Sequence, residues 1–209
     1  MIADVIKPLY PYIGRPISCL LAKNSSLSFH KGLAGQLIEQ ILGACSSNQR
    51  LPDLPHLGIE IKTLPVSTQG IPLENTFINK ITLPFDEPKF EKSMLWLKIQ
   101  KILWVPLIGS RHTMMLDKII GHPVIWQPDG DTFDQIKKDW YELTTYIRLG
   151  EFDQLNSQIG EFLHIRPKAA NATQKIQLNI NGFNHYVLPI GFYFRKILTR
   201  KIIESNYAF

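Results

Sequence analysis

The sequence predicts an α/β fold in which a mixed sheet is flanked by helices. Residues Leu57–Leu64 (LGIEIKTL) alternate apolar and polar side chains, which is typical of a strand with one buried face. Residues Ile99–Leu107 contain the apolar string ILWVPL, which indicates a second strand. Residues Asp131–Leu149 instead place apolar side chains at helical spacing. This mixture of strands and helices indicates an α/β architecture.

The part of the chain before the helix at Asp131 is expected to contain one further helix and two further strands. The helix is predicted over Lys31–Ala44, because its apolar residues recur at helical spacing and form one face. The strands are predicted at Thr76–Leu83 and Pro123–Trp126. The apolar face of the helix consists of Ala34, Leu37, Ile38, Ile41 and Leu42.

The helix predicted over Asp131–Leu149 has recognisable ends. Asp131 or Thr132 is suited to cap its first turn, and Gly150 is suited to end it. We expect its buried stripe to consist of Phe133, Ile136, Trp140, Leu143 and Ile147.

The C-terminal part is expected to contain short strands followed by a final helix. The strands are predicted around Phe162–Arg166, Lys175–Ile180 and Tyr186–Pro189, and the helix from about Gly191 to Glu204. No repeat or linker separates two cores, so residues 1–209 are expected to form a single domain. The residues that the final helix is expected to bury are Phe194, Ile197, Leu198 and Ile202.

Composition excludes several classes of protein. With 44% hydrophobic and 20% charged residues, the chain is typical of a folded globular protein. Cys19 and Cys45 are the only cysteines, which argues against a disulfide scaffold or structural zinc and favours a reducing cytoplasm. No apolar run approaches the ~20 residues that cross a bilayer, so no membrane is expected.

The charge distribution favours a polyanionic partner. The net charge is +5, and Glu161–Phe209 holds seven Lys or Arg against two acids. Asp129–Asp153 holds seven acids against three bases. One basic and one acidic region are consistent with nucleic-acid binding, although many folded proteins also have a basic side.

The strand at Glu60 carries the residues best suited to catalysis. Glu60 and Lys62 are two positions apart and share a face of the strand, and Asp53 precedes the strand. Two converging carboxylates favour a hard cation such as Mg²⁺ between them. A lysine beside such a site can orient water and stabilise charge on a phosphate, which is the chemistry of phosphodiester hydrolysis.

The same pattern has a simpler interpretation. An Asp followed by Glu-x-Lys is common, and on an exposed strand it forms a solvated pair or a weak salt bridge. Glu39, on the preceding helix, is a third acid that could reach the same cation, or it is an ordinary acid of a helix surface.

A second group of residues is suited to reading DNA. Arg166 and Lys168 flank Pro167, and an arginine can bridge the O6 and N7 atoms of guanine. The alternative is a basic loop that contacts phosphates only, or nothing. Tyr193, close to the basic residues near the chain end, is either a packed aromatic or a base contact.

Several longer blocks resemble the MutH family of mismatch-repair endonucleases, which is related to restriction enzymes that cut GATC. They run in the same order from about Leu20 to about Arg200. The first twenty residues and the shortened segment between Asn79 and Lys98 depart from the family. The blocks are KGLAGQLIEQILGA, GIEIKTLPV with an upstream PD, KILWVPL, GEFLHIRPKAANA and LPIGFYFRK.

The resemblance implies a restriction-endonuclease-like fold whose two lobes form a DNA-binding cleft. Catalytic residues would lie within 31–107 and DNA-reading segments within 160–204. It implies a catalytic set of Asp53, Glu60 and Lys62 with Glu39, in which Asp53 and Glu60 hold Mg²⁺. The DNA-binding residues that it implies are Lys31, Phe77, Lys98, Arg166, Lys168 and Tyr193.

The implied activity is nicking of the unmethylated strand at hemimethylated GATC sites in methyl-directed mismatch repair. The enzyme would act as a monomer, with MutL as its activator and MutS as an indirect partner. Two alternatives remain open. One is a type II restriction endonuclease that cuts both strands of GATC, and the other is a catalytically silent DNA-binding module.

Overall fold

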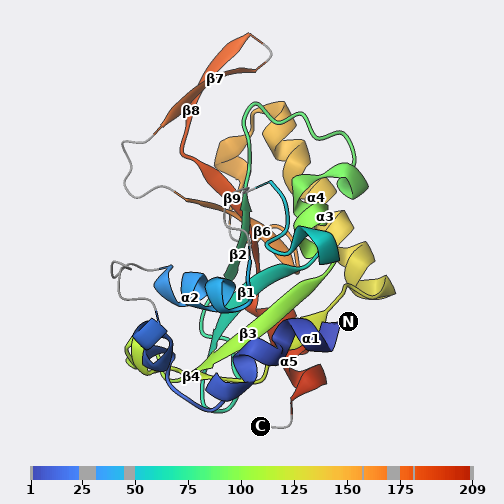
Figure 1. Cartoon of the computed structure of the whole chain (residues 1–209). Coiled ribbons are helices and arrows are strands. Elements are labelled where there is room, and N and C mark those ends of the chain that lie inside the picture. Colours follow the sequence, from blue (N-terminus) through green and yellow to red (C-terminus); the bar gives the residue numbers. More distant parts are fainter. Residues whose placement is uncertain are drawn as a thin grey trace. The chain divides into compact units, whose positions relative to one another are not determined.

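The computed structural model describes residues 2–23, 32–44, 50–156, 158–168, 175–180 and 182–207 (Figure 1). The chain divides into two compact units, each assembled from separate stretches of sequence. Unit 1 contains Met1–Glu74, Gln100–Gln127 and Arg200–Phe209, and unit 2 contains Asn75–Ile99 and Pro128–Thr199. No helix in the described part of the chain is long and apolar enough to cross a bilayer.

Unit 1 is built around a mixed four-stranded sheet. Its central strand β3 (Ile102–Ile108) pairs in parallel with β1 (Glu60–Val66). The short strands β4 (Ile119–Ile120) and β5 (Val124–Trp126) both pair with β3 in the antiparallel sense. The helical segments of this unit are α1 (Ile2–Ile6), η1 (Lys7–Tyr12), η2 (Ile17–Lys23), α2 (Leu33–Ile41), η3 (Pro55–Leu57) and η5 (Met115–Asp117).

The core of unit 1 joins α2 to one face of this sheet. Leu37 and Ile38 of α2 are fully buried in the same cluster as Ile59 and Ile61. This burial confirms the predicted apolar face of the helix and the inward-facing positions around Glu60. Glu60 and Lys62 therefore project from the opposite face of β1.

Unit 2 contains a three-stranded antiparallel sheet and a separate hairpin. In the sheet, β9 (Ile190–Phe194) lies between β2 (Thr76–Lys80) and β6 (Leu163–Pro167). The hairpin consists of β7 (Ile176–Ile180) and β8 (Phe183–Val187). The helical segments are η4 (Phe90–Lys92), α3 (Met94–Ile99), α4 (Gly130–Leu149) and η6 (Phe152–Gln154), while α5 (Lys196–Asn206) begins in unit 2 and continues in unit 1.

The helix α4 largely follows its prediction but has a different cap. The residue before the helix, Asp129, accepts a hydrogen bond from the Thr132 amide at 3.0 Å, so neither Asp131 nor Thr132 is the cap. Gly150 ends the helix with a φ of 78°, as expected for a glycine in this place. Four stripe residues are buried: Ile136, Trp140, Leu143 and Ile147, and Phe133 is half-buried.

A buried carboxylate ties α4 to the first residues of β6. The Asp139 side chain is almost fully buried and accepts hydrogen bonds from the backbone amides of Glu161, Phe162 and Leu163 at 3.0, 2.7 and 2.8 Å. Its other oxygen accepts from the side-chain Nε2 of Gln135 at 2.7 Å. A buried carboxylate requires hydrogen-bond donors. Because the donors of Asp139 are the amides of residues 161–163, Asp139 fixes where β6 begins.

The predicted final helix is wrong at its beginning. Residues Ile190–Phe194 form strand β9 instead, because their bulky side chains favour a strand and both of its edges are paired. Phe194 is buried in that strand, and α5 begins only at Lys196. Ile197 is 49% exposed, which contradicts its predicted burial.

Two predicted strands begin later than expected. β1 begins at Glu60, because Pro55 starts a 3-10 turn and Gly58 takes a left-handed φ of 62°. β3 begins at Ile102, because Met94–Ile99 forms the helix α3. Strand β8, in contrast, begins earlier than predicted, at Phe183 rather than Tyr186.

Candidate functional site

Glu60 and Lys62 form an ion pair on the face of β1 opposite the one that packs against α2. The Lys62 Nζ donates to Glu60 Oε1 at 2.6 Å. Glu60 is 1% exposed and Lys62 is half-buried, so the pair is largely withdrawn from bulk solvent. The strand itself is fixed by its parallel pairing with β3 and by the Glu60 amide, which donates to the Lys101 carbonyl at 3.0 Å.

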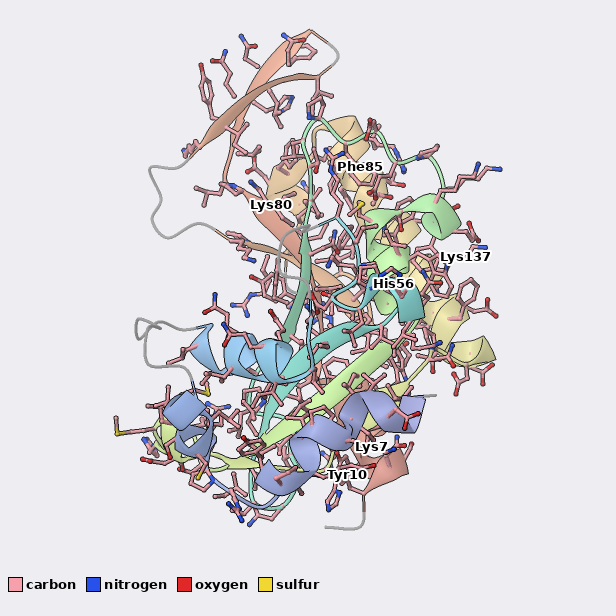
Figure 2. All side chains as sticks on the ribbon, in the orientation of Figure 1. Lys7, Tyr10, His56, Lys80, Phe85 and Lys137 are labelled. Atoms are coloured by element: carbon pink, nitrogen blue, oxygen red, sulfur yellow. The ribbon has the colours of Figure 1, made fainter. Side chains whose placement is uncertain are left out.

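A tight turn returns Asp53 to this strand. The backbones of Leu54 and Ile59 exchange hydrogen bonds of 2.9 and 3.3 Å and close a small loop. Within that loop lies η3, whose His56 side chain is exposed (Figure 2). The loop brings the Asp53 carboxylate to the Ile61 amide, which donates to its Oδ2 at 2.8 Å. The Asp53 carboxylate is thereby held at the backbone of the residue that follows Glu60, although seven positions separate Asp53 from Glu60 in the sequence.

Glu39 lies on α2 in the same unit as the other three residues. It is half-buried, and α2 packs against β1 through the shared core. Its Oε1 lies back along the helix, 3.7 Å from where a Cβ at Gly35 would stand. The proposed role of Glu39 as a fourth active-site residue stays a prediction.

The donor set fits a hard divalent cation. Such a cation is commonly held by one or two protein carboxylates, with water and substrate phosphate as its other ligands. Asp53 and Glu60 supply two carboxylates, and each offers about four lone-pair positions, so the hydrogen bonds described above exhaust neither. Among the described residues no group of three or more His, Cys, Asp or Glu is placed to hold a metal, so a cation here would rely on these two.

The sheet of unit 2 brings four of the predicted DNA-binding residues together. Strand pairing sets Tyr193 of β9 opposite Phe77 of β2, and their ring centroids lie 5.2 Å apart. The Arg166 guanidinium lies 5.9 Å from the Tyr193 ring, and the Lys168 Nζ lies 3.0 Å from the centre of the Phe77 ring. We call Phe77, Arg166, Lys168 and Tyr193 the reading cluster.

The reading cluster presents two cations supported by aromatic rings. Arg166 and Lys168 are exposed, while Phe77 and Tyr193 are half-buried. A cation over an aromatic ring is attracted to the face of the ring, which restricts the conformations of the cationic side chain. Two cations held in this way can meet the phosphates or the major-groove base edges of a duplex.

The Phe77 ring lies close against the backbone of β9. A Cβ built at Gly191 would stand 2.8 Å from Cε2 of the Phe77 ring and 2.9 Å from the Asn79 carbonyl oxygen. Real Cβ atoms do not approach so closely, so only glycine permits this ring position. The pairing of β2 with β9 also shifts register between Phe77 and Asn79.

His164 is a buried residue of this region that sequence reasoning did not single out. It is 2% exposed and faces Tyr193 across the β6–β9 pair, with ring centroids 6.0 Å apart. Neither ring nitrogen has a hydrogen-bond partner within the part of the chain that the structure describes. Burial, assisted by the charges of Arg195 and Arg166, lowers the pKa of His164 to about 4. The ring is therefore neutral at pH 7.

The depressed pKa predicts that acid weakens the fold through His164. The unfolded chain binds a proton at this residue near pH 6.5 and the folded chain near pH 4, so the free energy of unfolding should fall between these values as the pH drops. Urea unfolding of a His164→Gln variant from pH 7 to pH 4 should give a flatter profile than the unaltered protein. The His56→Gln variant, altered at an exposed histidine, serves as the control. Equal slopes for His164→Gln and the unaltered protein would contradict the prediction.

The two remaining predicted DNA-binding lysines are placed differently. Lys98 lies on α3, before β3, and is 6% exposed. Its proposed position near the scissile phosphate stays a prediction. Lys31 lies outside the described residues, as does the part of the basic block that follows Lys168.

Comparison with known proteins points to one family. A family model described as DNA mismatch repair enzyme MutH matches residues 42–139, a stretch that contains Asp53, Glu60 and Lys62. The DNA mismatch repair protein MutH of Haemophilus influenzae (strain PittGG) is 40% identical over 177 residues, which cover 84% of this chain and 79% of the relative. The proteins of that name from Actinobacillus pleuropneumoniae serotype 5b (strain L20) and Pasteurella multocida (strain Pm70) are each 39% identical over 84% of this chain, and the match covers 78% and 80% of their lengths.

Proposed function

Because the chain belongs to the MutH family of DNA mismatch repair endonucleases, we propose that it nicks the unmethylated strand of duplex DNA at hemimethylated GATC sites. The observation that carries this proposal is the geometry at the start of β1. There the Lys62 ammonium lies 2.6 Å from Glu60, and the Asp53 carboxylate accepts a hydrogen bond from the Ile61 backbone amide. Carboxylates and an ammonium in this arrangement suit the hydrolysis of a phosphodiester.

Each member of the catalytic set has a distinct proposed task. Asp53 and Glu60 hold Mg²⁺, which when bound would supply Lewis-acid stabilisation of the phosphate. Lys62 orients the attacking water and offers its positive charge to the oxygens of the scissile phosphate. Glu39 is proposed to complete the site from α2.

Recognition is assigned to unit 2. Arg166 and Lys168 are proposed to contact base edges of GATC, with Tyr193 sensing adenine methylation and Phe77 supporting Lys168. Lys31 and Lys98 are proposed to contact the DNA backbone. The support for this assignment is the cluster geometry, because residues far apart in the sequence meet on one small sheet.

The partners follow from the role in mismatch repair. We propose that the enzyme acts as a monomer in the cytoplasm, with MutL as its activator and MutS acting through MutL. Its two lobes are proposed to enclose duplex DNA in a cleft.

One assay tests this proposal. The protein is incubated with Mg²⁺ and unmethylated, hemimethylated or fully methylated GATC duplexes, with and without MutL. We expect nicks in the unmethylated strand of the first two, no cleavage of the third, and stimulation by MutL.

The same assay separates the alternatives. Cleavage of both strands without MutL would instead indicate a restriction endonuclease. The absence of any cleavage, even with MutL, would indicate a DNA-binding module.

A further inference from the structure

The hairpin of β7 and β8 carries different side chains on its two faces. β7 pairs with β8 in the antiparallel sense, from Ile176 opposite Val187 to Ile180 opposite Phe183. Figure 1 shows the hairpin as a ribbon of its own, outside the three-stranded sheet. Because side chains alternate along a strand, the register gives the hairpin one mainly apolar face and one polar face.

The apolar face contacts the rest of unit 2 through part of its length, while Phe183 on the same face is 72% exposed. Leu178 and Val187 are buried, and the His185 ring lies 5.9 Å from the Phe152 ring of η6. A Cβ at Gly150, the residue that ends α4, would stand 2.9 Å from the His185 ring. These contacts fix which face of the hairpin is turned inward, so the other face is turned to solvent.

The outward face is polar and carries no formal charge. Its residues are Gln177, Asn179, Asn184 and Tyr186, and all four are exposed. The side-chain Nδ2 of Asn179 donates to the Asn184 Oδ1 at 3.2 Å, so the two carboxamides are aligned across the strands. Tyr186 is 61% exposed, which means that its ring contributes little to the folding of the hairpin.

The chemistry of this face suits the grooves of duplex DNA. Carboxamides donate and accept together, as the edge of adenine requires, and a two-stranded ribbon fits the major groove. Asn and Gln also read A·T pairs in the minor groove. No acidic residue occurs between Glu161 and Glu204, so nothing in this stretch of sequence repels phosphates.

The hairpin is continuous with the reading cluster. β6, which carries Arg166, precedes β7 in the chain, and β9, which carries Tyr193, follows β8. The Lys168 amide donates to the Pro189 carbonyl at 2.7 Å, directly between the β6–β9 pair and the hairpin. The hairpin therefore leads directly into the sheet that carries the reading cluster.

We propose that the outward face of the β7–β8 hairpin is a second DNA-contacting surface, which binds duplex next to the recognition sequence. The proposal rests on the proposed function, because it requires that the reading cluster holds a GATC duplex. The contact is made by neutral hydrogen bonds and by the Tyr186 ring, and not by charge.

The test compares two duplexes of different length in an Asn184→Ala/Tyr186→Ala double variant. One duplex carries little more than GATC, and the other extends it by about one helical turn, ~10 base pairs, on each side. We expect the ratio of long-duplex to short-duplex affinity to fall roughly tenfold in the variant, as the loss of a few neutral contacts implies. The dependence of long-duplex affinity on salt should keep its slope, because no charge is removed.

Controls separate the failure of this proposal from the failure of the proposed function. Tyr10→Ala removes a tyrosine that is 50% exposed on η1 and should leave the ratio as it is (Figure 2). An unchanged ratio in the double variant, or an equal loss for both duplexes, would overturn the second surface. If the unaltered protein does not prefer a GATC duplex to one without the site, the proposed function itself fails.

Discussion

A Lys62→Ala variant is expected to cleave GATC duplexes at least ~100-fold more slowly than the unaltered protein, because one stabilising charge is lost at the phosphate. Its affinity for the same duplex should stay close to normal, since this half-buried lysine is paired with Glu60 rather than presented at an exposed surface. The two quantities are measured separately, by single-turnover nicking with Mg²⁺ and by binding with Ca²⁺ in place of Mg²⁺.

A matched control for this variant exists in the same unit. Lys7 pairs with Asp4 at 2.6 Å, the same distance as in the Lys62 pair, but it is exposed at the start of η1 (Figure 2). Lys7→Ala should nick at the normal rate. Lys62→Met keeps the aliphatic stem and should be as inactive as Lys62→Ala, which separates lost charge from lost packing.

The paired carboxylate gives an independent check on the metal assignment. Glu60→Gln should also abolish nicking, and a Mg²⁺ titration of its cleavage should show no recovery at high concentration if Glu60 is a ligand. Normal nicking by either Lys62→Ala or Glu60→Gln would show that the catalytic set has been assigned to the wrong residues.

An Arg166→Ala variant is expected to lose discrimination at one base pair of GATC by about 1–3 kcal/mol, or roughly 5- to 150-fold in relative affinity. The reason is that the guanidinium, supported by the Tyr193 ring, is exposed and can bridge two acceptors of one base. Binding to GATC is compared with binding to each singly substituted site at one salt concentration.

The pattern of affinity loss across DNA sequences distinguishes a base contact of Arg166 from a contact with phosphate only. If Arg166 touches only phosphate, the variant should bind all sequences more weakly by the same factor, and its salt slope should decrease by ~0.9. That outcome would remove Arg166 from base recognition. Arg111→Ala, altered at another exposed arginine, should change neither the preference nor the rank order of the sites.

The sequence predicted the placement of Glu60 and Lys62 better than it predicted the geometry of the reading cluster. Glu60 and Lys62 are close in sequence, so strand periodicity alone placed them on one face. The position of Asp53 depends on the Leu54–Ile59 bridge and the left-handed Gly58, which no periodicity reveals.

The reading cluster depends on pairing between distant segments. Phe77, Arg166 and Tyr193 come together only because β9 inserts between β2 and β6. The run that contains Tyr193 was predicted to be helical, since its apolar residues also fit helical spacing. It forms a strand instead, because it pairs with β2 on one side and with β6 on the other. His164 and Arg166 are two positions apart, so the sequence already placed them on one face of β6. The burial of His164 against Tyr193 could not be predicted, because it depends on the pairing of β6 with β9.

The missing side chain at Gly191 has a consequence for the reading cluster. The Phe77 ring occupies the space where a methyl group at Gly191 would stand, and the Lys168 ammonium lies over that ring. A single added carbon would thus press on the Phe77 ring that lies beneath Lys168 and on the Asn79 carbonyl of β2. A substitution at Gly191 is therefore expected to disturb the reading cluster although it alters none of the four residues of that cluster.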